Sequence, residues 1–338
     1  HDYSTTGSGS GGQAWYNMDM VVDPGNQAVV YCGGVNVFRS DDTGRTWTIA
    51  GYWVNQIHAD QHELVASPLT NRIYAGNDGG LYASRNRGAS WTPLKSGLGI
   101  AQIYKMDAAR NKKDILITGF QDNGTGNYNE GWFTTYGGDG MDCAIDQTDP
   151  RYSYGELYYG SVFRVFNVNA QASIAYNGYI AAGSDTINES GAWVTPLALR
   201  EGNGTTMYIG YKNIWRSTNI RSNPVQWRKI SNNLGGTNGS NFTEIESNIA
   251  NSDILYASRS NGTLYRSDNV NASSPTWTSL SQPVAGVVNA IETDPKNQNV
   301  VYIGIGQRVY RSTNKGGSWT QLNSTFSHNV SSILLDTS

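Results

Sequence analysis

The sequence predicts an all-β fold, a seven-bladed β-propeller of four-stranded antiparallel blades. Three observations support this prediction. A short polar segment recurs at distant points of the chain, a longer unit of about 40 to 50 residues recurs around it, and each unit holds about four short alternating runs separated by Gly, Asn, Asp or Ser. The length of 338 residues suits one such domain, because propellers routinely use such a length as a single compact unit.

One aromatic or apolar residue in the expected second strand marks each repeating unit. The clearest copies span 19–48 and 290–320, where an apolar stretch ending in Asp-Pro precedes a β-branched pair, Tyr, a Gly-rich turn and an Arg-Ser strand. The seven markers, 38 to 54 residues apart, are Tyr31, Tyr74, Leu116, Tyr154, Tyr208, Tyr256 and Tyr302. They predict seven up-and-down blades. The fourth strand of blade four stays unplaced between 169 and 193.

The recurring polar segment, here called the box, reads SDDTGRTWT at 40–48, SRNRGASWT at 84–92 and STNKGGSWT at 312–320. We expect each box between the third and fourth strands, with its glycine at positive φ, its Asp or Asn capping backbone amides, and its Trp starting the fourth strand and filling the wedge between blades. The residues in these three roles are Gly44, Gly88 and Gly316, then Asp42, Asn86 and Asn314, then Trp47, Trp91 and Trp319. Because such a turn recurs from unit to unit, we expect the boxes to stabilise the blades and not to form the functional site.

Charge and hydropathy exclude two classes of partner. Lys and Arg number 24 against 27 Asp and Glu, a net charge of -3, so no nucleic acid partner is expected. No run approaches the roughly 18 apolar residues that a membrane span needs, so we expect no membrane insertion. The chain begins at His1 without a signal-type segment, which suggests a mature or excised piece and further domains of a longer chain.

The expected domain limits follow from the repeats. We expect a Gly/Ser-rich arm at 1–13, the propeller at 14–325, and an extra strand or the start of a following segment at 326–338. Blade one should then close directly against blade seven. The two cysteines fall in different blades of this scheme, Cys32 in the second strand of blade one and Cys143 in the first strand of blade four. Because a disulfide needs α-carbons within about 7 Å, we expect two free, buried thiols.

The boxes resemble the Ser-x-Asp-x-Gly-x-Thr-Trp Asp-box, or BNR repeat, with the Asp kept only at Asp42. Asp-boxes occur in sialidases, sortilin-type receptor propellers and two-propeller xyloglucanases. Four further segments resemble a family of large secreted bacterial proteins with sortilin-like propellers, many exported by the type IX system. They are HADQHELV at 58–65, AGNDGGLYAS at 75–84, GFQDNGTGNY at 119–128 and GGDGMDCAIDQTDP at 137–150. This resemblance implies a secreted or cell-surface location.

The chain also departs from the enzyme families that share Asp-boxes. A sialidase has an Arg-Ile-Pro stretch near its start, and none occurs here, so the protein is not expected to be a sialidase. The xyloglucanases place one catalytic Asp in each of two tandem propellers, whereas this chain supplies one propeller. An active site of that kind would be incomplete without a second propeller.

Topology predicts where the four distinctive segments lie. Turns between the second and third strands, and connections from one blade to the next, emerge on the face opposite the boxes. Asn77 and Asp78 belong to such a turn of blade two, and the residues from Gln121 through Asp122 to Asn123 belong to that of blade three. Residues 58–62 and 137–142 lie where blades two and four begin. We therefore expect the four segments to converge on the box-free face of blades two to four.

Histidines and carboxylates supply the chemistry of this face. His58, Asp60 and His62 alternate, so in a strand they would share one face and could ligate a metal, or Asp60 could orient a neutral imidazole. No third His or Cys follows at a suitable spacing, which favours hydrogen bonding. Asp78, Asp122 and Asp139 are candidate catalytic carboxylates, since a pair about 5 to 10 Å apart is the minimum for glycoside hydrolysis.

Each of these carboxylates has a second interpretation. Asp78, Asp122 and Asp139 precede or lie near glycines, so each could simply cap a turn. Calcium is a further option, because carboxylates together with Gln121 and Asn123 offer oxygen ligands, although no EF-hand spacing is present. No other cofactor is expected.

Aromatic residues beside the same face fit a carbohydrate partner. Tyr52 and Trp53 directly precede the His-Asp-His row, and exposed rings can stack on sugar faces, although packing between blades is the alternative. The sequence therefore predicts a propeller that binds a polysaccharide or glycoprotein through Tyr52, Trp53 and the polar residues above. The alternative is a glycoside hydrolase or lyase that uses paired carboxylates of that face and needs a second propeller.

Overall fold

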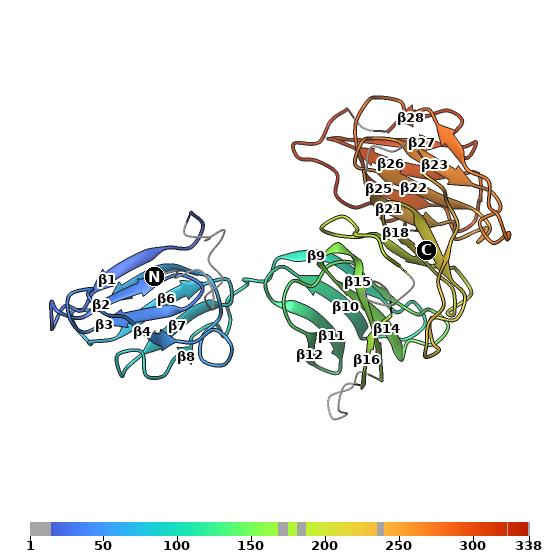
Figure 1. Ribbon diagram of the computed structural model, residues 1–338. Helices are drawn as coiled ribbons and strands as arrows, with labels where there is room; N and C mark the ends of the chain where they lie inside the picture. The colour runs from blue at the N-terminus through green and yellow to red at the C-terminus, as the bar shows by residue number, and fades with distance from the viewer. Residues whose placement is uncertain (1–14, 168–174, 181–186, 235–239, 323, 337–338) are drawn as a thin grey trace. The chain divides into compact units, whose positions relative to one another are not determined.

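The protein is described here by a computed structural model covering residues 15–167, 175–180, 187–234, 240–322 and 324–336 (Figure 1). Its regular structure in these ranges is almost entirely β. Twenty-eight strands form seven four-stranded antiparallel sheets, and within each sheet the strands are adjacent in chain order. The predicted fold class, a seven-bladed β-propeller of up-and-down blades, is confirmed.

The chain divides into two compact units, one ending at Ala101 and one beginning at Gln102. The N-terminal unit holds blades one and two. Blade one consists of β1 (Asp19–Val22), β2 (Val30–Gly33), β3 (Val37–Ser40) and β4 (Thr48–Gly51). Blade two consists of β5 (Gln61–Ala66), β6 (Ile73–Asn77), β7 (Gly80–Ser84) and β8 (Thr92–Pro93).

The C-terminal unit holds the other five blades. Blade three consists of β9 (Ile103–Ala108), β10 (Ile115–Phe120), β11 (Gly124–Asn129) and β12 (Trp132–Tyr136). Blade four consists of β13 (Cys143–Ile145), β14 (Tyr152–Leu157), the 3-10 turn η1 (Tyr158–Gly160), β15 (Ser161–Phe166) and β16 (Ala175–Tyr179). Blade five consists of β17 (Leu197–Leu199), β18 (Met207–Gly210), β19 (Ile214–Ser217) and β20 (Arg228–Lys229). Blade six consists of β21 (Phe242–Ser247), β22 (Leu255–Arg259), β23 (Leu264–Ser267) and β24 (Thr278–Leu280), and blade seven of β25 (Val288–Thr293), β26 (Val301–Ile305), β27 (Arg308–Ser312) and β28 (Thr320–Gln321).

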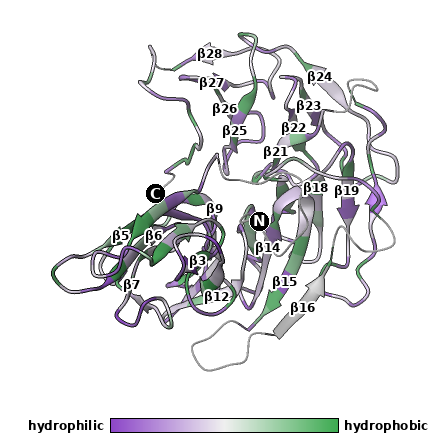
Figure 2. Ribbon diagram, turned by 60° about the vertical axis from the view of Figure 1, so that its left-hand side comes forward, coloured by the Kyte–Doolittle hydropathy of each residue, from purple (hydrophilic) through white to green (hydrophobic). Residues whose placement is uncertain are grey.

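All seven predicted markers fall in the second strands of their blades. Four of them, Tyr31, Tyr154, Tyr208 and Tyr256, are fully buried. Apolar side chains of neighbouring blades form a separate cluster at each blade interface within a unit, for example around Val301 between blades six and seven. Figure 2 shows hydrophobic residues, in green, along central strands of the sheets such as β6 and β15. The previously unplaced fourth strand of blade four is β16, between residues 175 and 179.

The boxes lie between the third and fourth strands, as predicted, and share one hydrogen-bond scheme. In the first box the Gly44 amide donates to Ser40 Oγ (2.8 Å) and the Thr46 amide donates to Asp42 Oδ1 (2.8 Å). The other two boxes repeat both bonds with Ser84 and Asn86, and with Ser312 and Asn314. The three box glycines have φ between 85° and 86°. The expected capping role of Asp and Asn is confirmed.

The box tryptophans differ from expectation in two respects. The fourth strands begin one residue later, at Thr48, Thr92 and Thr320, which are the residues that pair with the third strands. Trp91 Nε1 donates to Ala50 O (2.8 Å) and Trp319 Nε1 to Ser281 O (2.9 Å), so these indoles reach the preceding blade as predicted. Trp47 Nε1 instead donates to Gly44 O of its own box (3.0 Å).

Two further turns use the same scheme without the box glycine. In blades five and six, Ser217 and Ser267 bond to Asn219 and Asn269, which accept backbone amides seven residues later. The tryptophan of the sixth-blade turn, Trp277, donates to Ile230 O of blade five (3.0 Å). Their longer span and missing glycine hide these turns from the sequence pattern.

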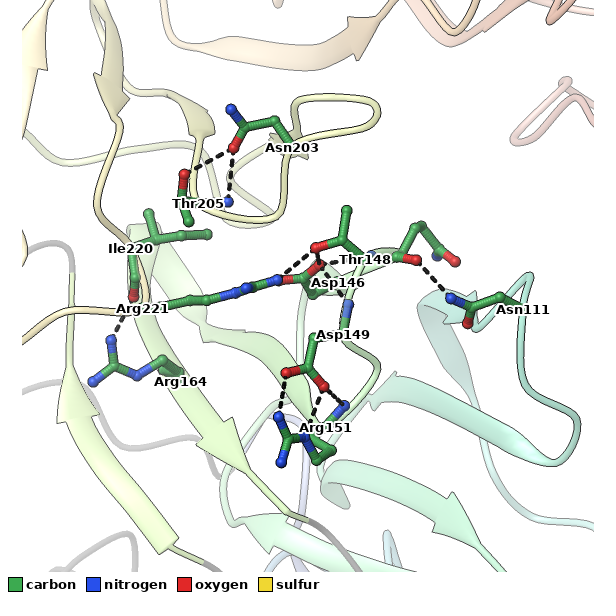
Figure 3. A network of polar contacts seen from close by, with 11 residues as sticks. Asn111, Asp146, Thr148, Asp149, Arg151, Arg164, Asn203, Thr205, Ile220 and Arg221 are labelled. Atoms are coloured by element: carbon green, nitrogen blue, oxygen red, sulfur yellow. Dashed lines mark hydrogen bonds and ion pairs between the residues drawn. The ribbon is translucent and has the colours of Figure 1, made fainter.

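A polar network joins blade four to blade five at the box end of the sheets (Figure 3). Asp146, which follows β13, accepts the amides of Thr148 (2.9 Å) and Asp149 (3.1 Å). The guanidinium of Arg221, in the long turn of blade five, donates Nε–H to Asp146 Oδ2 (2.8 Å). Because Asp146 is fully buried, this charge-assisted hydrogen bond links blade four to blade five inside the protein. The network is part of the scaffold.

The remaining sequence expectations have these outcomes. Cys32 and Cys143 are free and buried, as predicted, and burial raises the pKa of both thiols. The arm at 1–13 lies outside the described residues. Residues 324–336 contain no strand; the Val330 amide donates to Gly306 O (2.8 Å), and Val330 packs against Gly304. No helix in the described part of the chain has the length and apolar character that a bilayer crossing requires. The domain limits and the closure of blade one against blade seven stay predictions.

Candidate functional site

The loops at the box-free end of blades one and two form a continuous surface, here called the N-terminal rim. It comprises residues 15–18 before β1, the β2–β3 turn (34–36), the β4–β5 connection (52–60) and the β6–β7 turn (78–79), with His62 of β5. Backbone bonds tie these segments together: the Gln61 amide donates to Gly34 O (2.8 Å), and the Trp53 amide donates to Asn36 Oδ1 (3.0 Å). The rim therefore brings together the site residues predicted within this unit, with Asn77 at its edge as the last residue of β6.

A histidine and a carboxylate form a pair on the rim. His62 Nε2–H donates to Asp78 Oδ1 at 2.8 Å. The ring of Tyr16 meets the imidazole edge-on, with centroids 4.8 Å apart. Asp60 lies close by and accepts a hydrogen bond from Asn17 Nδ2 (2.5 Å). Burial raises the pKa of Asp60, and the charge of Asp78 adds to this shift.

The expected His58–Asp60–His62 row on one strand face is wrong. β5 begins only at Gln61, and Asp60 has φ of +63°, a left-handed conformation that interrupts any alternation. His58 Nδ1–H donates to Ala59 O (3.2 Å), while His62 donates to Asp78. The three candidate metal ligands thus each engage another group of the chain, which suits the hydrogen-bonding interpretation.

Asn77 and His58 fix the β6–β7 turn at the edge of the rim. Asn77 Oδ1 accepts the Gly79 amide (3.1 Å), and its Nδ2 donates to Gln61 Oε1 (3.1 Å), so Asn77 caps the β6–β7 turn. His58 packs so closely over this turn that a Cβ on Gly79 would lie 2.4 Å from His58 Cγ. Gly79 is therefore required for the approach of the imidazole.

Several aromatic rings share the N-terminal rim with the His62–Asp78 pair. Trp53 is 46% exposed, and Tyr52 is half-buried beside it. Trp15 and Tyr16, before the first strand, are 86% and 44% exposed. Sequence reasoning included Tyr52 and Trp53 but missed Trp15, Tyr16 and Asn17. The aromatic pair at 15–16, next to a polar residue and outside any strand, was the available signal.

The predicted site residues of the C-terminal unit lie on two adjacent turns. The Asp122 amide donates to Asp139 Oδ1 (2.9 Å), and the Gly124 amide donates to Gly138 O (2.7 Å). Asp122 has φ of +57°, and Asn123 Nδ2 donates to Gln121 O (3.1 Å). Asp139 therefore caps the neighbouring turn rather than its own. Asp122 and Asp139 are brought together, whereas Asp78 belongs to the N-terminal unit.

The first strands of the C-terminal unit carry a second set of carboxylates, which sequence reasoning missed. Lys105 Nζ donates to Glu244 Oε1 (2.8 Å), and burial raises the pKa of Glu244 to about 7. Asp142 Oδ2 accepts the Leu197 amide (3.1 Å). The available signal was the charged alternation of Lys105 with Asp107, and of Glu244 with Glu246.

These strands also line a small open pocket of about 180 Å³. Arg110 Nη1 donates to Glu201 Oε2 (2.9 Å) at its wall, and Asp107 accepts the Ile145 amide (2.7 Å). Burial and the charge of Glu292 raise the pKa of Glu246 well above its usual range. Glu244 and Glu201 pair with Lys105 and Arg110, while Asp107 and Asp142 accept backbone amides, and these contacts indicate a structural role.

The chain is similar to several known protein structures, although its sequence matches no known family. No family model and no curated protein sequence matches the chain. It is similar to a GH74 enzyme of Niastella koreensis (15% identity, TM-score 0.31, covering 91% of this chain and 56% of that one) and to the GH74 xyloglucanase of Xanthomonas campestris (16%, 0.31, 89% and 51%). YCF48 of Cyanidioschyzon merolae gives 11% identity and a TM-score of 0.42, covering 88% and 93%.

The chain spans about half the length of the two GH74 proteins. At these identities and TM-scores, the fold assignment rests on the order and pairing of the strands themselves.

Proposed function

We propose that the protein binds a polysaccharide, or the glycan of a glycoprotein, through the box-free ends of its blades, and that it does so outside the cell or at the cell surface. The N-terminal rim carries this proposal. Its central observation is that the exposed rings of Trp15, Tyr16 and Trp53 share one rim with a fixed imidazole–carboxylate pair, His62 and Asp78, and that Tyr16 packs directly against the imidazole.

This combination suits a sugar. Pyranose rings present C–H faces that stack on aromatic rings, and hydroxyl groups that need both donors and acceptors. With Nε2–H of His62 bonded to Asp78, Nδ1 of the imidazole is an acceptor, and the indole N–H groups of Trp15 and Trp53 are donors. Holding the imidazole against Asp78 and Tyr16 before binding reduces the entropy lost when a ligand is bound.

The boxes support a relation to Asp-box propellers of the sortilin-like kind. Their Ser and Asp or Asn side chains bond the same backbone amides in all three copies. We infer that the scaffold is of that kind and that the ligand-binding function belongs to the opposite end of the blades.

The test uses a panel of soluble polysaccharides in affinity electrophoresis. The probes are hydroxyethylcellulose, xyloglucan, galactomannan, laminarin and polygalacturonate. Trp53→Ala and His62→Ala should each weaken retention of the bound probe at least about tenfold, a loss of about 1.4 kcal/mol. Leu69→Ala, a 93% exposed residue of the same unit away from the rim, is the matched control. Retention that is unchanged in both rim variants contradicts this site.

A further inference from the structure

Three aromatic side chains form an exposed platform on blade four, here called the blade-four platform: Tyr158, Tyr159 and Trp193. The rings of Tyr158 and Trp193 are nearly parallel, with centroids 5.2 Å apart and an interplanar angle of 6°. Tyr159 meets Trp193 edge-on at 5.4 Å. The three side chains are 41%, 48% and 43% exposed, an unusual exposure for rings gathered in one place.

The platform lies at the box-free end of its blade. Tyr158 and Tyr159 occupy the turn η1 between β14 and β15, and Trp193 precedes β17 in the connection from blade four to blade five. Leu157, next to Tyr158, lies against the turn that holds Asp139, since a Cβ on Gly138 would be 3.1 Å from Leu157 Cδ2. The platform thus continues the surface formed by Asp122 and Asp139 within the same unit.

Backbone contacts fix the two loops of the platform to each other. The Tyr159 amide donates to Trp193 O (3.3 Å), and the Gly191 amide donates to Tyr159 O (3.1 Å). Trp193 Nε1 donates to the hydroxyl of Tyr104 (3.2 Å). Tyr159 has φ of +64°, a region that bulky residues rarely adopt. The surrounding structure therefore holds this ring in place at the cost of local backbone strain.

A buried carboxyl group lies beneath both loops. Glu156 Oε1 accepts the amide of Gly160 (2.9 Å) and the amide of Thr195 (3.0 Å). Tyr211 donates its hydroxyl to Gly160 O (2.6 Å). One side chain thus anchors the turn that carries the two tyrosines and the connection that carries Trp193. The platform is ordered by the protein itself, without a ligand.

We propose that the blade-four platform is a carbohydrate-binding subsite that takes the uncharged pyranose rings of a polysaccharide. Flat, rigid rings with polar groups at their edges match the C–H faces and hydroxyl groups of a sugar. The adjoining loops include the acidic side chains of Asp122, Asp139 and Glu189, with Lys212 in the turn bonded to Glu189, and the chain carries a net charge of -3. These charges oppose the binding of acidic polysaccharides and nucleic acids.

The proposal shares only its ligand class with the proposed function of the N-terminal rim. It uses different residues in a different unit, so each can fail alone. The same polysaccharide panel is applied to Tyr158→Ala and Trp193→Ala, with Trp193→Phe as the conservative variant and Trp132→Ala, a 57% exposed Trp of the same unit, as the control.

The expected result is at least a tenfold weaker retention of a neutral probe in both alanine variants. Trp193→Phe should stay within about threefold of the unmodified protein, because it keeps a ring for stacking, and Trp132→Ala should be unchanged. Circular dichroism and the melting temperature confirm that each variant folds. A variant that does not fold is replaced by Tyr159→Ala, whose ring meets the rings of Tyr158 and Trp193.

Two results separate the two proposals, and a third overturns the blade-four proposal whatever the variants show. Retention lost in Trp53→Ala and His62→Ala but kept in the platform variants overturns the blade-four proposal alone. Retention lost only in the platform variants supports it and contradicts the N-terminal rim. Binding of none of the neutral probes by the unmodified protein, or binding of polygalacturonate alone, overturns the blade-four proposal.

Discussion

The phenol ring of Tyr158 lies parallel to the indole of Trp193, 35 residues away in the sequence, with the ring centroids 5.2 Å apart. The pair holds together because its two loops share one buried anchor, Glu156. Burial raises the pKa of Glu156 well above its usual range, and the charge of Asp142 adds to the shift. Burial thus favours the neutral form of this carboxyl group, and its Oε2 has no hydrogen-bond partner among the described residues.

Substitutions of Glu156 show whether this residue stabilises the two loops as a hydrogen-bond acceptor or through its charge. Glu156→Gln keeps an acceptor oxygen and carries no charge, so the free energy of unfolding should fall by less than about 1 kcal/mol. Glu156→Ala leaves the amides of Gly160 and Thr195 buried without acceptors, and should cost about 3 kcal/mol. Urea denaturation measures both values. An equal loss in the two variants contradicts the anchoring role.

Gly79 sets the shape of the N-terminal rim. A methyl group there would overlap the imidazole of His58 near its attachment to the backbone, so Gly79→Ala should displace His58 and destabilise the protein by about 1 to 3 kcal/mol. Gly99→Ala is the matched control, because a Cβ at Gly99 meets nothing within 4 Å. Thermal unfolding compares the two. A Gly79→Ala protein as stable as Gly99→Ala shows that the close packing of His58 is dispensable.

Stability should fall between acidic and neutral pH. Burial raises the pKa of Glu292 from 4.5 to about 7, with Glu201 adding repulsion and Arg110 opposing it. Between these two pH values, Glu292 holds a proton in the folded protein that it has lost in the unfolded chain. The stabilisation from this proton is therefore fully present below pH 4.5 and is lost as the pH rises through about 7.

Glu292→Gln should remove part of this slope. Because Glu292 keeps some solvent contact, the expected change between pH 5 and pH 8 is about 1 kcal/mol in the free energy of unfolding. Glu63→Gln, on an exposed position of β5, is the control. The same slope in Glu292→Gln and in the unmodified protein would show that other groups cause the pH dependence.

The repeat is readable from the sequence because each blade repeats the same local chemistry. The glycines, Ser and Asp or Asn of the boxes fix a turn within nine residues, and the markers fix the second strands. The turns of blades five and six escape this pattern because Asn219 and Asn269 make the same bonds across a longer loop without glycine. A local motif predicts geometry only where its spacing is kept.

The functional surfaces are less readable because they depend on contacts between distant segments. Alternation suggested that His58, Asp60 and His62 share a strand face, but the left-handed conformation of Asp60 separates them. The blade-four platform arises from the pairing of β14 with β15 and from backbone bonds to the loop at Trp193. Neither relationship leaves a periodic trace in the sequence.

The central claim is that the protein retains a polysaccharide without cleaving it. The most direct measurement follows retention of each probe and the appearance of new reducing ends in the same sample over a day. We expect at least one neutral polysaccharide to be retained with no increase in reducing ends above the protein-free control. New reducing ends that disappear in Asp122→Ala or Asp139→Ala, or retention of no probe at all, would contradict it.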